Sequence, residues 1–458
     1  MSHPIHYPEG HVLLRNLNKS YPVISHGSGV HLFDETGKKY FDASGGALVA
    51  NLGHGHLELA DRIAAQMKKV AYVNGMQFTS RPMEALAANL AKKAEPLGLD
   101  RVALLASGSE AIEAAIKFAR QLWVDRGYPG KHKLITRTPG YHGNTLYALS
   151  ASGRPHYKKV YGPLLSPVLT VSTPYGYRCP EVRSNDRDEI LAEYHEKGAD
   201  HYLKELETLI EREGANTISA FLLETVSGSS TGAWIPPKGY LHRVEALCKK
   251  HEILLIADEV MCGAGRTGTF FASEQFQFKP DLLVMGKGLN AGLMPVAAVL
   301  VKKTDVDTMK RGSGGFLHAQ TYMQTPSMAA TALAVVEYMD EHEVLKKAKA
   351  VSEHWLSELH SHLHTLPFVG SITGIGHMAG IEFVENKASK APFPIVKKFA
   401  QKFVQHAQDQ GLVLWPNYGQ ADGTNGDLVM LGPSLQMSMK EADECVGLLK
   451  HALATFEI

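Results

Sequence analysis

The stretch "LLVMGKGLNAGLMP", residues 282–295, places a lysine between two glycines directly after an apolar run. Four consecutive apolar residues are typical of a buried strand, so Lys287 comes where that strand should end. Its stem would pack on apolar neighbours while the ammonium reaches water. Alternatively, burial would keep the amine partly neutral, which makes a lysine nucleophilic near neutral pH. This stretch alone leaves both interpretations open.

Short apolar runs like this one recur along the chain and alternate with helical patterns. Residues 110–123 show the helical pattern, because their apolar residues recur at a spacing of three and four. Such alternation predicts an α/β fold with a mostly parallel sheet covered by helices on both faces. The strand candidates are residues 101–107, 133–138, 219–225, 253–260 and 282–287.

The pattern changes after about residue 325. Long helical stretches at 327–366 and 393–410 flank short strands near 376–384, and a final strand at 428–438 precedes a closing helix. An N-terminal hairpin is expected at 30–42, and the charged stretch 176–216 should be a surface excursion that ends in a helix. We predict a large domain at 76–325, a smaller α+β domain at 326–458, and an N-terminal segment at 1–75 that joins the smaller domain.

Composition narrows the classes of function. Lysine plus arginine equals aspartate plus glutamate at 47 each, which disfavours nucleic acid and anionic membranes as partners. The four cysteines are scattered without paired-ligand spacing, so we expect free thiols, no metal site and a reducing compartment. The most apolar window, 282–301, contains Lys287, Asn290 and Pro295, which argues against a membrane span. A cytoplasmic location is the expectation.

The sequence "LLASGSEAIEAAIKFAR", residues 104–120, combines a strand end with a helix start. Free backbone amides and the positive end of a helix dipole make such a turn an anion site. Gly108 would allow close approach and Ser109 would add a hydroxyl. Ser107 and Glu110 also fit a capping box, which is purely structural. The spacing of a Walker A loop is absent.

A second strand, in "ILLIADEVMCGAGRTG" at 253–268, delivers Asp258 and Glu259 at its carboxyl end. Open α/β sheets bind their ligands at this edge. Side chains alternate along a strand, so one carboxylate should face the crevice and the other should face away. The glycines at 263–268 satisfy G-x-G-x-x-G, but aromatic residues rather than a clear helix follow them. A dinucleotide site is therefore disfavoured.

An anion site, an aspartate at one strand end and a lysine 29 residues later suit one cofactor, pyridoxal 5′-phosphate. That cofactor needs a phosphate site, an amine for a Schiff base and a carboxylate on its pyridine nitrogen. In "PGYHGNT", residues 139–145, Tyr141 would stack on the ring and His142 would accompany it. The alternative for Tyr141 is a loop aromatic that packs on the domain surface, but beside these other residues we favour stacking on the ring.

At this point the chain resembles the class III pyridoxal-phosphate-dependent aminotransferases, which have the fold type I architecture. The resemblance covers nearly the whole length. It runs through the segments "YFDASGGALVANLGHGH", "SGSEA", "YHG", "LLETVSGSSTGAWIPP", "DEVMCGAGRTGTFFASE", "PDLLVMGKGL" and "HAQTYMQTPSMAATALA".

The resemblance implies roles for individual residues. Lys287 should hold the cofactor as an internal aldimine and move a proton between substrate and cofactor, while Asp258 should pair with the pyridinium nitrogen. Val260 should pack under the ring, opposite Tyr141. The remaining residues implied at the cofactor are Gly108 and Ser109 at the phosphate, and His142.

Two further positions follow from the same resemblance. Glu224 resembles a glutamate near the cofactor hydroxyl, although a strand-end carboxylate that caps a loop is nearly as good an interpretation. Thr321 resembles a threonine that reaches the phosphate from the neighbouring subunit. The resemblance therefore implies a homodimer or a dimer of dimers, with 1–75 contributing to the contacts.

The resemblance also implies an aminotransferase (EC 2.6.1.-) that passes an amino group to a keto acid such as pyruvate or 2-oxoglutarate. Alternatives are an aminomutase, racemase or decarboxylase of the same fold, or a catalytically silent binding protein. Trp415 stands where many members carry an arginine for a substrate carboxylate, and a Gly/Asp/Asn-rich loop follows at 417–427.

The donor expectation rests on this departure. A buried carboxylate needs a paired cation, so we expect donors whose amine is remote from any carboxylate, such as ω-amines, β-amino acids or amino sulfonates. The small Gly46 and Ala47 should leave room beside the cofactor. The acceptor still needs a cation, for which the unranked candidates are Arg81, Arg154 and Arg266.

Overall fold

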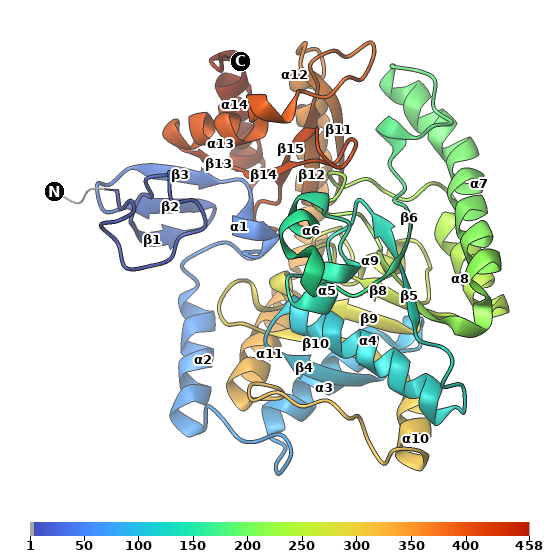
Figure 1. Ribbon diagram of the computed structural model, residues 1–458. Coiled ribbons are helices and arrows are strands. Elements are labelled where there is room, and N and C mark those ends of the chain that lie inside the picture. The colour runs from blue at the N-terminus through green and yellow to red at the C-terminus, as the bar shows by residue number, and fades with distance from the viewer. Residues whose placement is uncertain (1–3, 458) are drawn as a thin grey trace.

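The computed structural model describes residues 4–457 and is built around a seven-stranded sheet (Figure 1). Strands β9, β8, β7, β5 and β6 run parallel, whereas β10 pairs antiparallel with β4 and β9. The predicted α/β fold with a mostly parallel sheet is confirmed; β6 and β10 were not predicted. In spatial order the strands are β4 (Arg101–Leu105), β10 (Ala297–Val301), β9 (Leu282–Met285), β8 (Leu254–Asp258), β7 (Ile218–Glu224), β5 (Lys133–Thr138) and β6 (Leu169–Ser172).

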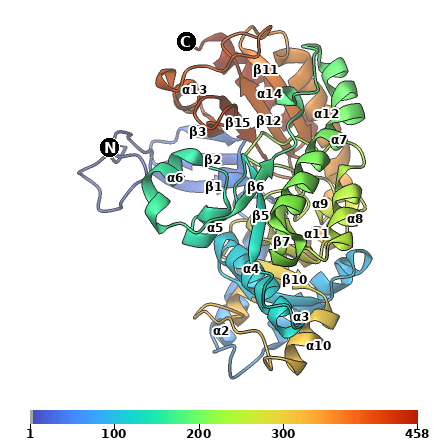
Figure 2. The same cartoon turned by 45° about the vertical axis from the view of Figure 1, so that its right-hand side comes forward.

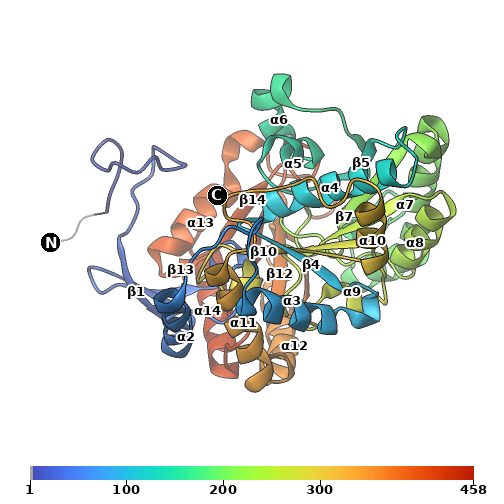
Figure 3. The ribbon, with the colours of Figure 1, turned by 90° about the horizontal axis from the view of Figure 1, so that it is seen from below.

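Helices cover both faces of this sheet because its strands are apolar on both sides. In β8, Ile256 belongs to the core under one layer of helices, whereas Leu255 and Ala257 belong to the core under the other. Figure 3 shows α4 on one side of the sheet and α3 and α11 on the other. The first layer contains α4 (Gly108–Asp125), α5 (Leu146–Ala151) and α10 (Lys303–Arg311); the second contains α3 (Arg81–Lys93), α7 (Arg187–Glu213), α8 (Tyr240–Lys250) and α11 (Pro326–Glu341).

A second, antiparallel sheet lies in the C-terminal part of the chain, beside α12, α13 and α14 (Figure 2). Its strands, in spatial order, are β11 (Val369–Ile375), β12 (Met378–Phe383), β15 (Asp427–Leu431) and β14 (Trp415–Tyr418). The helices are α12 (Val344–Leu363), α13 (Phe399–Asp409) and α14 (Met439–Ala454).

The N-terminal strands join this C-terminal part. The predicted hairpin is present as β2 (His31–Asp34) and β3 (Lys39–Asp42), flanked by β1 (Ile24–Ser28). Strand β13 (Leu412–Val413) pairs parallel with β3, and Phe41 shares one core with Trp355 and Phe403. The domain boundaries at 75 and 325 stay a prediction.

Three predicted elements differ in the structure. The stretch 327–366 is two helices, α11 and α12, because the chain turns at Glu343, whose φ is +48°. The stretch 393–410 is a short 3₁₀ turn followed by α13, and Lys398 between them has a φ of +51°. The last strand ends at Leu431, since Pro433 has no N–H to donate to a sheet.

The apolar periodicity continues across the break at Glu343 because each helix is amphipathic toward a different core. Met328 and Ala332 of α11 pack against the large sheet, whereas Trp355 and Leu359 of α12 pack in the C-terminal core.

The charged stretch 176–216 does contain the expected helix, α7, but this helix is more than a surface excursion. Its residues Tyr194, Tyr202 and Leu206 are buried in the core of the large sheet. Across residues 4–457, no helix is both long and apolar enough to cross a membrane. The remaining α-helices of the described residues are α1 (Gly45–Leu48), α2 (Leu57–Lys69), α6 (Pro155–Tyr161) and α9 (Ala272–Gln275).

Candidate active site

The carboxyl ends of three parallel strands bring the predicted polar residues to one edge of the large sheet. Glu224, the last residue of β7, lies opposite Asp258, the last residue of β8. Asp258 in turn lies opposite Val284 of β9, three residues before Lys287. These three polar side chains thus come from neighbouring strands at the edge where α/β sheets bind ligands.

Asp258 is held by two contacts. Its Oδ2 lies 2.8 Å from Nδ1 of His142, and its Oδ1 accepts a hydrogen bond from the Val260 backbone N–H at 3.0 Å. His142 follows β5, and its backbone N–H donates to Ser152 Oγ at 2.8 Å. Both side chains of the pair are buried. The Asp258 carboxylate is therefore fixed in place before any ligand binds.

Glu259 has a different role from its neighbour. Its carboxylate accepts hydrogen bonds from the backbone N–H groups of Ala272 and Ser273, at 2.6 and 2.7 Å, and from Thr225 Oγ1 at 3.0 Å. Burial raises the pKa of Glu259 to about 7. This carboxylate fixes the 260–273 segment, while Asp258 faces His142, as the alternation of side chains along a strand predicts.

Lys287 begins a short 3₁₀ turn and has a φ of +45°. Burial lowers the pKa of its amine to about 8, although the charges of Asp258 and Glu224 oppose the shift. Within residues 4–457 its Nζ forms no ion pair. An amine in this state is partly neutral near pH 7 and available as a nucleophile.

The glycine after Lys287 serves packing, not ligand approach. A Cβ on Gly288 would lie 2.0 Å from the Asn51 side-chain nitrogen, so only glycine fits there. Asn51 in turn donates to the Ala264 carbonyl at 2.8 Å. This contact joins the lysine turn to the segment after β8.

The Ser-Gly-Ser turn opens α4 beside the same edge. Ser107 is the N-cap and accepts from the Glu110 N–H at 3.3 Å, but Glu110 accepts from Ala106 rather than Ser107, so only half of the capping box forms. A Cβ on Gly108 would lie 2.8 Å from Val260 Cγ1. The first turn of α4 therefore packs directly on Val260.

The loop that carries Tyr141 and His142 contacts this turn. Ser109 Oγ accepts from the Asn144 N–H at 3.0 Å, and a Cβ on Gly143 would lie 2.6 Å from the same oxygen. Tyr141 is partly buried, and burial raises the pKa of its phenol. The structure thus brings together the 141–144 loop, the start of α4 and Val260.

Glu224 both caps a loop and lies beside Asp258, so its contacts fit both of the interpretations given for it from the sequence. Its Oε2 accepts a hydrogen bond from Ser230 Oγ, so it does stabilise the loop after β7. It also lies beside Asp258, and burial raises the pKa of its carboxyl.

Thr321 is not part of this group. It is exposed and lines a hollow of about 870 Å³ together with Tyr72, Asn74 and Gln324. Gly46 also lies elsewhere, in a hollow of about 320 Å³ with His54 and Gly292. Within this single chain, neither hollow is lined by Lys287 or Asp258.

The three candidate arginines occupy different surroundings. Arg81 is exposed at the start of α3. Arg266 is fully buried and donates to the carbonyls of His377 and Pro433, at 3.1 and 2.5 Å, which makes it a structural tie between loops. Burial lowers its pKa to about 9. Arg154 contacts the loop of Tyr141, with its guanidinium carbon 5.6 Å from the centroid of the Tyr141 ring.

Two residues near this arginine were missed by the sequence reasoning. Asn417 Oδ1 accepts from Arg154 at 2.5 Å, and Ser229 Oγ accepts from it at 2.8 Å. Asn417 was placed in a loop but belongs to β14. The strand-like "LVLW" just before it was the available signal, although no local pattern links it to Arg154.

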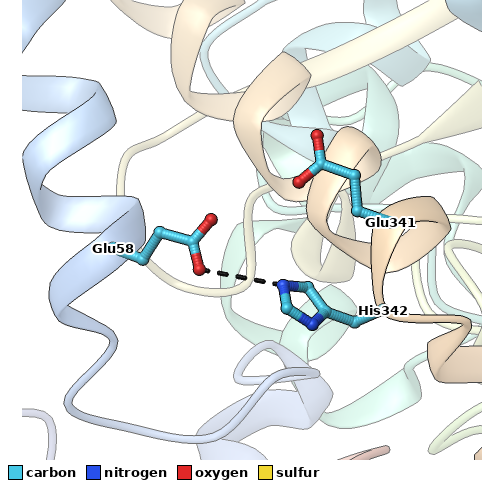
Figure 4. Close-up of side chains that lie close together, drawn as sticks. All are labelled: Glu58, Glu341 and His342. Atoms are coloured by element: carbon cyan, nitrogen blue, oxygen red, sulfur yellow. Dashed lines mark ion pairs between the residues drawn. The ribbon is translucent and has the colours of Figure 1, made fainter.

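A separate group of Glu58, Glu341 and His342 lies at the surface between α2 and the end of α11 (Figure 4). Glu58 is 3.7 Å from His342, and Arg62 Nη2 donates to both carboxylates at 2.6 Å. Because an arginine already compensates the two negative charges, this group carries no argument for a metal ion.

The model of the family "Aminotransferase class-III" matches residues 15–453. The chain belongs to this family. An uncharacterized aminotransferase of Bacillus subtilis, YodT, is 35% identical over 96% of this chain and 97% of its own. The present chain is therefore an aminotransferase (EC 2.6.1.-), and its class and fold are those predicted from the sequence.

Solved structures agree with this assignment. An (S)-enantioselective omega-transaminase from Thermomicrobium roseum matches with a TM-score of 0.86 and 34% identity, over 98% of this chain and 96% of its own. An amine transaminase from an uncultivated Pseudomonas species, in its PLP-bound form, matches with a TM-score of 0.87 and 29% identity over 99% of both chains. Pyridoxal 5′-phosphate is therefore the cofactor of this aminotransferase.

The side chains at the sheet edge fit that cofactor. Pyridoxal phosphate needs an amine, a carboxylate and an anion site. Here these are the Lys287 amine with its lowered pKa, the fixed Asp258 carboxylate and the N-terminus of α4. The His142 Nε2 is buried without a hydrogen-bond partner, which leaves it free to bind a group in the site.

Proposed function

We propose that this aminotransferase takes its amino group from ω-amines, β-amino acids or amino sulfonates and passes it to a keto acid such as pyruvate or 2-oxoglutarate. The observation that carries the donor proposal is the position of Trp415. Trp415 packs on an apolar cluster that contains Val226, and Met261 packs on the same cluster; these two residues follow Glu224 and Asp258 closely in the chain. An indole has no charge to pair with an α-carboxylate, so an acid-free donor binds this side at lower cost.

The names of two structural relatives support this class of donor. One is an omega-transaminase and the other is an amine transaminase. Both names describe transfer from amines, which agrees with an uncharged surface at Trp415.

We assign the following roles to the residues of the site. Pyridoxal phosphate, when bound, supplies an electron sink that stabilises charge at the carbon bearing the amine. Lys287 would hold it covalently and, once released, its amine accepts and returns the proton of that carbon. Asp258, fixed by His142 and the Val260 N–H, keeps a negative charge at the pyridine nitrogen. Gly108 and Ser109 would bind the phosphate.

Three residues would complete the cofactor site. Tyr141 and Val260 would contact opposite faces of the ring, since the loop 141–144 and Val260 both pack against the start of α4. Glu224 would contact the cofactor hydroxyl, beside Asp258.

A panel of donors with pyruvate as acceptor tests the proposal through the rate of alanine formation. Terminal amines, β-amino acids and amino sulfonates should outrun ordinary α-amino acids. Common α-amino acids that outrun every terminal amine would refute the donor class. Product formed without any keto acid would instead indicate an aminomutase, racemase or decarboxylase.

We also propose a homodimer, or a dimer of dimers, in which Thr321 contacts the cofactor phosphate of the neighbouring subunit. Thr321 is exposed and lies away from Lys287 of its own chain, which is what such a role needs. Thr321→Ala should weaken cofactor retention by a few-fold, measured by dialysis and absorbance. A fully active monomer in light scattering would contradict the assembly.

A further inference from the structure

Arg154 is a buried cation without an acidic partner. The residue is 5% exposed and directly precedes α6. Its Nη1 donates to Asn417 Oδ1 and its Nη2 donates to Ser229 Oγ, both of which are neutral acceptors. No carboxylate in residues 4–457 lies within ion-pair distance of this guanidinium, and its Nε is buried without any hydrogen-bond partner. A buried charge without an opposite charge beside it destabilises a folded protein, so a buried arginine of this kind needs a functional explanation.

The contacts of Arg154 fix its orientation. The Asn417 amide nitrogen donates to the Ser229 carbonyl at 2.5 Å, which turns the amide oxygen toward the arginine. Asn417 and Ser229 are themselves buried. Two segments that are remote in sequence from Arg154 therefore hold its guanidinium in place, and a preorganised arginine is a good partner for a planar acid group.

The position of this guanidinium relates it to the active site. It lies against the Tyr141 ring, and the negative charge of Glu224 acts on it against the effect of burial, which lowers its pKa. Ser229 is in the loop that Glu224 stabilises through Ser230. Asn417 is two residues from Trp415 on β14, so the two side chains share one face of that strand.

Other buried arginines differ in this respect. The guanidinium of Arg266 donates its hydrogen bonds to backbone carbonyls and to Asn51. Arg137 donates to the Glu224 carbonyl and lies between the rings of Phe221 and Tyr240, within the core of the large sheet. Only Arg154 combines neutral partners with a place beside Tyr141.

We propose that Arg154 binds the carboxylate of the keto acid acceptor, with Asn417 and Ser229 as positioning residues. This inference rests on the proposed function, because it assigns the acceptor of the same reaction. It gives the site two kinds of contact on the substrate side. An acid-bearing acceptor pairs with Arg154, whereas an acid-free donor contacts the uncharged Trp415, which lies on the same strand as Asn417.

The test separates the two half-reactions of the holoenzyme by stopped-flow absorbance of the cofactor. One half-reaction uses n-butylamine, which has no acid group, and the other uses pyruvate with the amine-loaded enzyme. Arg154→Gln should raise the pyruvate concentration at half-saturation by at least about 30-fold. It should shift the ratio of pyruvate to n-butylamine efficiency by at least about tenfold. Propionate, an unreactive carboxylate, should lose its competition with pyruvate.

Asn417→Asp is the second variant, for the case that Arg154→Gln does not fold. It supplies an internal carboxylate to Arg154, which should compete with the substrate carboxylate and raise the half-saturating pyruvate concentration in the same direction. Arg243→Gln is the matched control, since Arg243 is exposed on α8 and pairs with Asp200 at 2.6 Å, away from the site.

The outcomes distinguish the two proposals. If wild-type enzyme converts both substrates and neither Arg154→Gln nor Asn417→Asp changes the pyruvate dependence, the Arg154 inference is overturned while the proposed function stands. If wild-type enzyme accepts neither n-butylamine nor any other terminal amine, the proposed donor class fails. An equal loss in both half-reactions would indicate a merely structural role for Arg154.

Discussion

The cofactor side and the substrate side that we propose for the active site are assembled differently. On the cofactor side, Glu224, Asp258 and Lys287 come from the ends of three neighbouring strands or from the turn that follows. On the substrate side, Arg154, Ser229 and Asn417 come from a helix start, a loop and a strand of another sheet. The first arrangement follows from strand order alone, whereas the second depends on how two parts of the chain pack together.

This difference has a functional consequence. In this proposal, residues on the cofactor side would take part in every turnover, whichever substrate is bound. Residues on the substrate side would contact only some of the substrates, so their loss should change selectivity more than chemistry. Variants on the cofactor side should therefore lower the rates of both half-reactions equally. Variants on the substrate side should lower the rate of one half-reaction more than the other.

The largest effect is expected for Lys287→Ala. Both half-reactions should fall together, by at least about 10²–10⁴-fold, because the variant loses both the covalent link and the mobile base. Single-turnover absorbance with n-butylamine and with pyruvate measures the two losses, and circular dichroism checks the fold. A variant that kept more than a few per cent of activity would place the chemistry on another group.

The next largest effect is expected for Asp258→Asn, which we compare with a variant of the adjacent carboxylate, Glu259. Asp258→Asn keeps the shape but removes the charge at the pyridine nitrogen, so turnover should fall by at least about 100-fold in both half-reactions. Glu259→Gln should instead lower the free energy of unfolding by about 1–3 kcal/mol, because its amide N–H₂ would face the N–H donor of either Ala272 or Ser273, which bind different oxygens of the Glu259 carboxylate.

Kinetics and urea unfolding of both variants provide the comparison. A larger loss of turnover in Glu259→Gln than in Asp258→Asn, with both folded, would mean that the wrong carboxylate has been assigned to the cofactor.

The strand ends and the helix start on the proposed cofactor side were predictable from the sequence because each motif there is local. A strand end, the residues after it and the helix that follows are contiguous in "LLASGSEA" and "LLIADEV", and both are where the patterns placed them. The break at Glu343 was invisible because apolar residues recur at helical spacing on both of its sides.

The substrate side was less accessible to sequence reasoning. Arg154 was one of three unranked arginines, and its neutral hydrogen-bond partners and its place beside Tyr141 distinguished it from the exposed Arg81 and the fully buried Arg266. Asn417 and Ser229 carry no local signal, since their role arises from a contact between β14 and the loop after β7. Strand β10 was missed because its apolar run, after Pro295, was interpreted only as part of a membrane-like window.

A smaller effect concerns pH. Burial disfavours the Lys287 ammonium and lowers the pKa of the amine from 10.5 to about 8, so the neutral amine appears as the pH rises through about 8. The rate at which cofactor-free protein captures pyridoxal phosphate at this lysine should rise about tenfold between pH 7 and pH 9, and then level off. Absorbance follows the capture, with the signal of Lys287→Ala subtracted. A rate that keeps rising beyond pH 10 would contradict a buried, depressed amine.

The central claim is that Lys287, and no other lysine, holds the cofactor. Lys131 is the instructive comparison, because it is also buried but donates to the carbonyls of Ala215 and Glu252, at 2.9 and 2.8 Å. Borohydride reduction of the holoenzyme, followed by digestion and mass spectrometry, locates the attached cofactor. We predict a single pyridoxyl group on the peptide that contains Lys287 and none in Lys287→Ala. Attachment to Lys131 or another lysine, with Lys287 unmodified, would contradict the account.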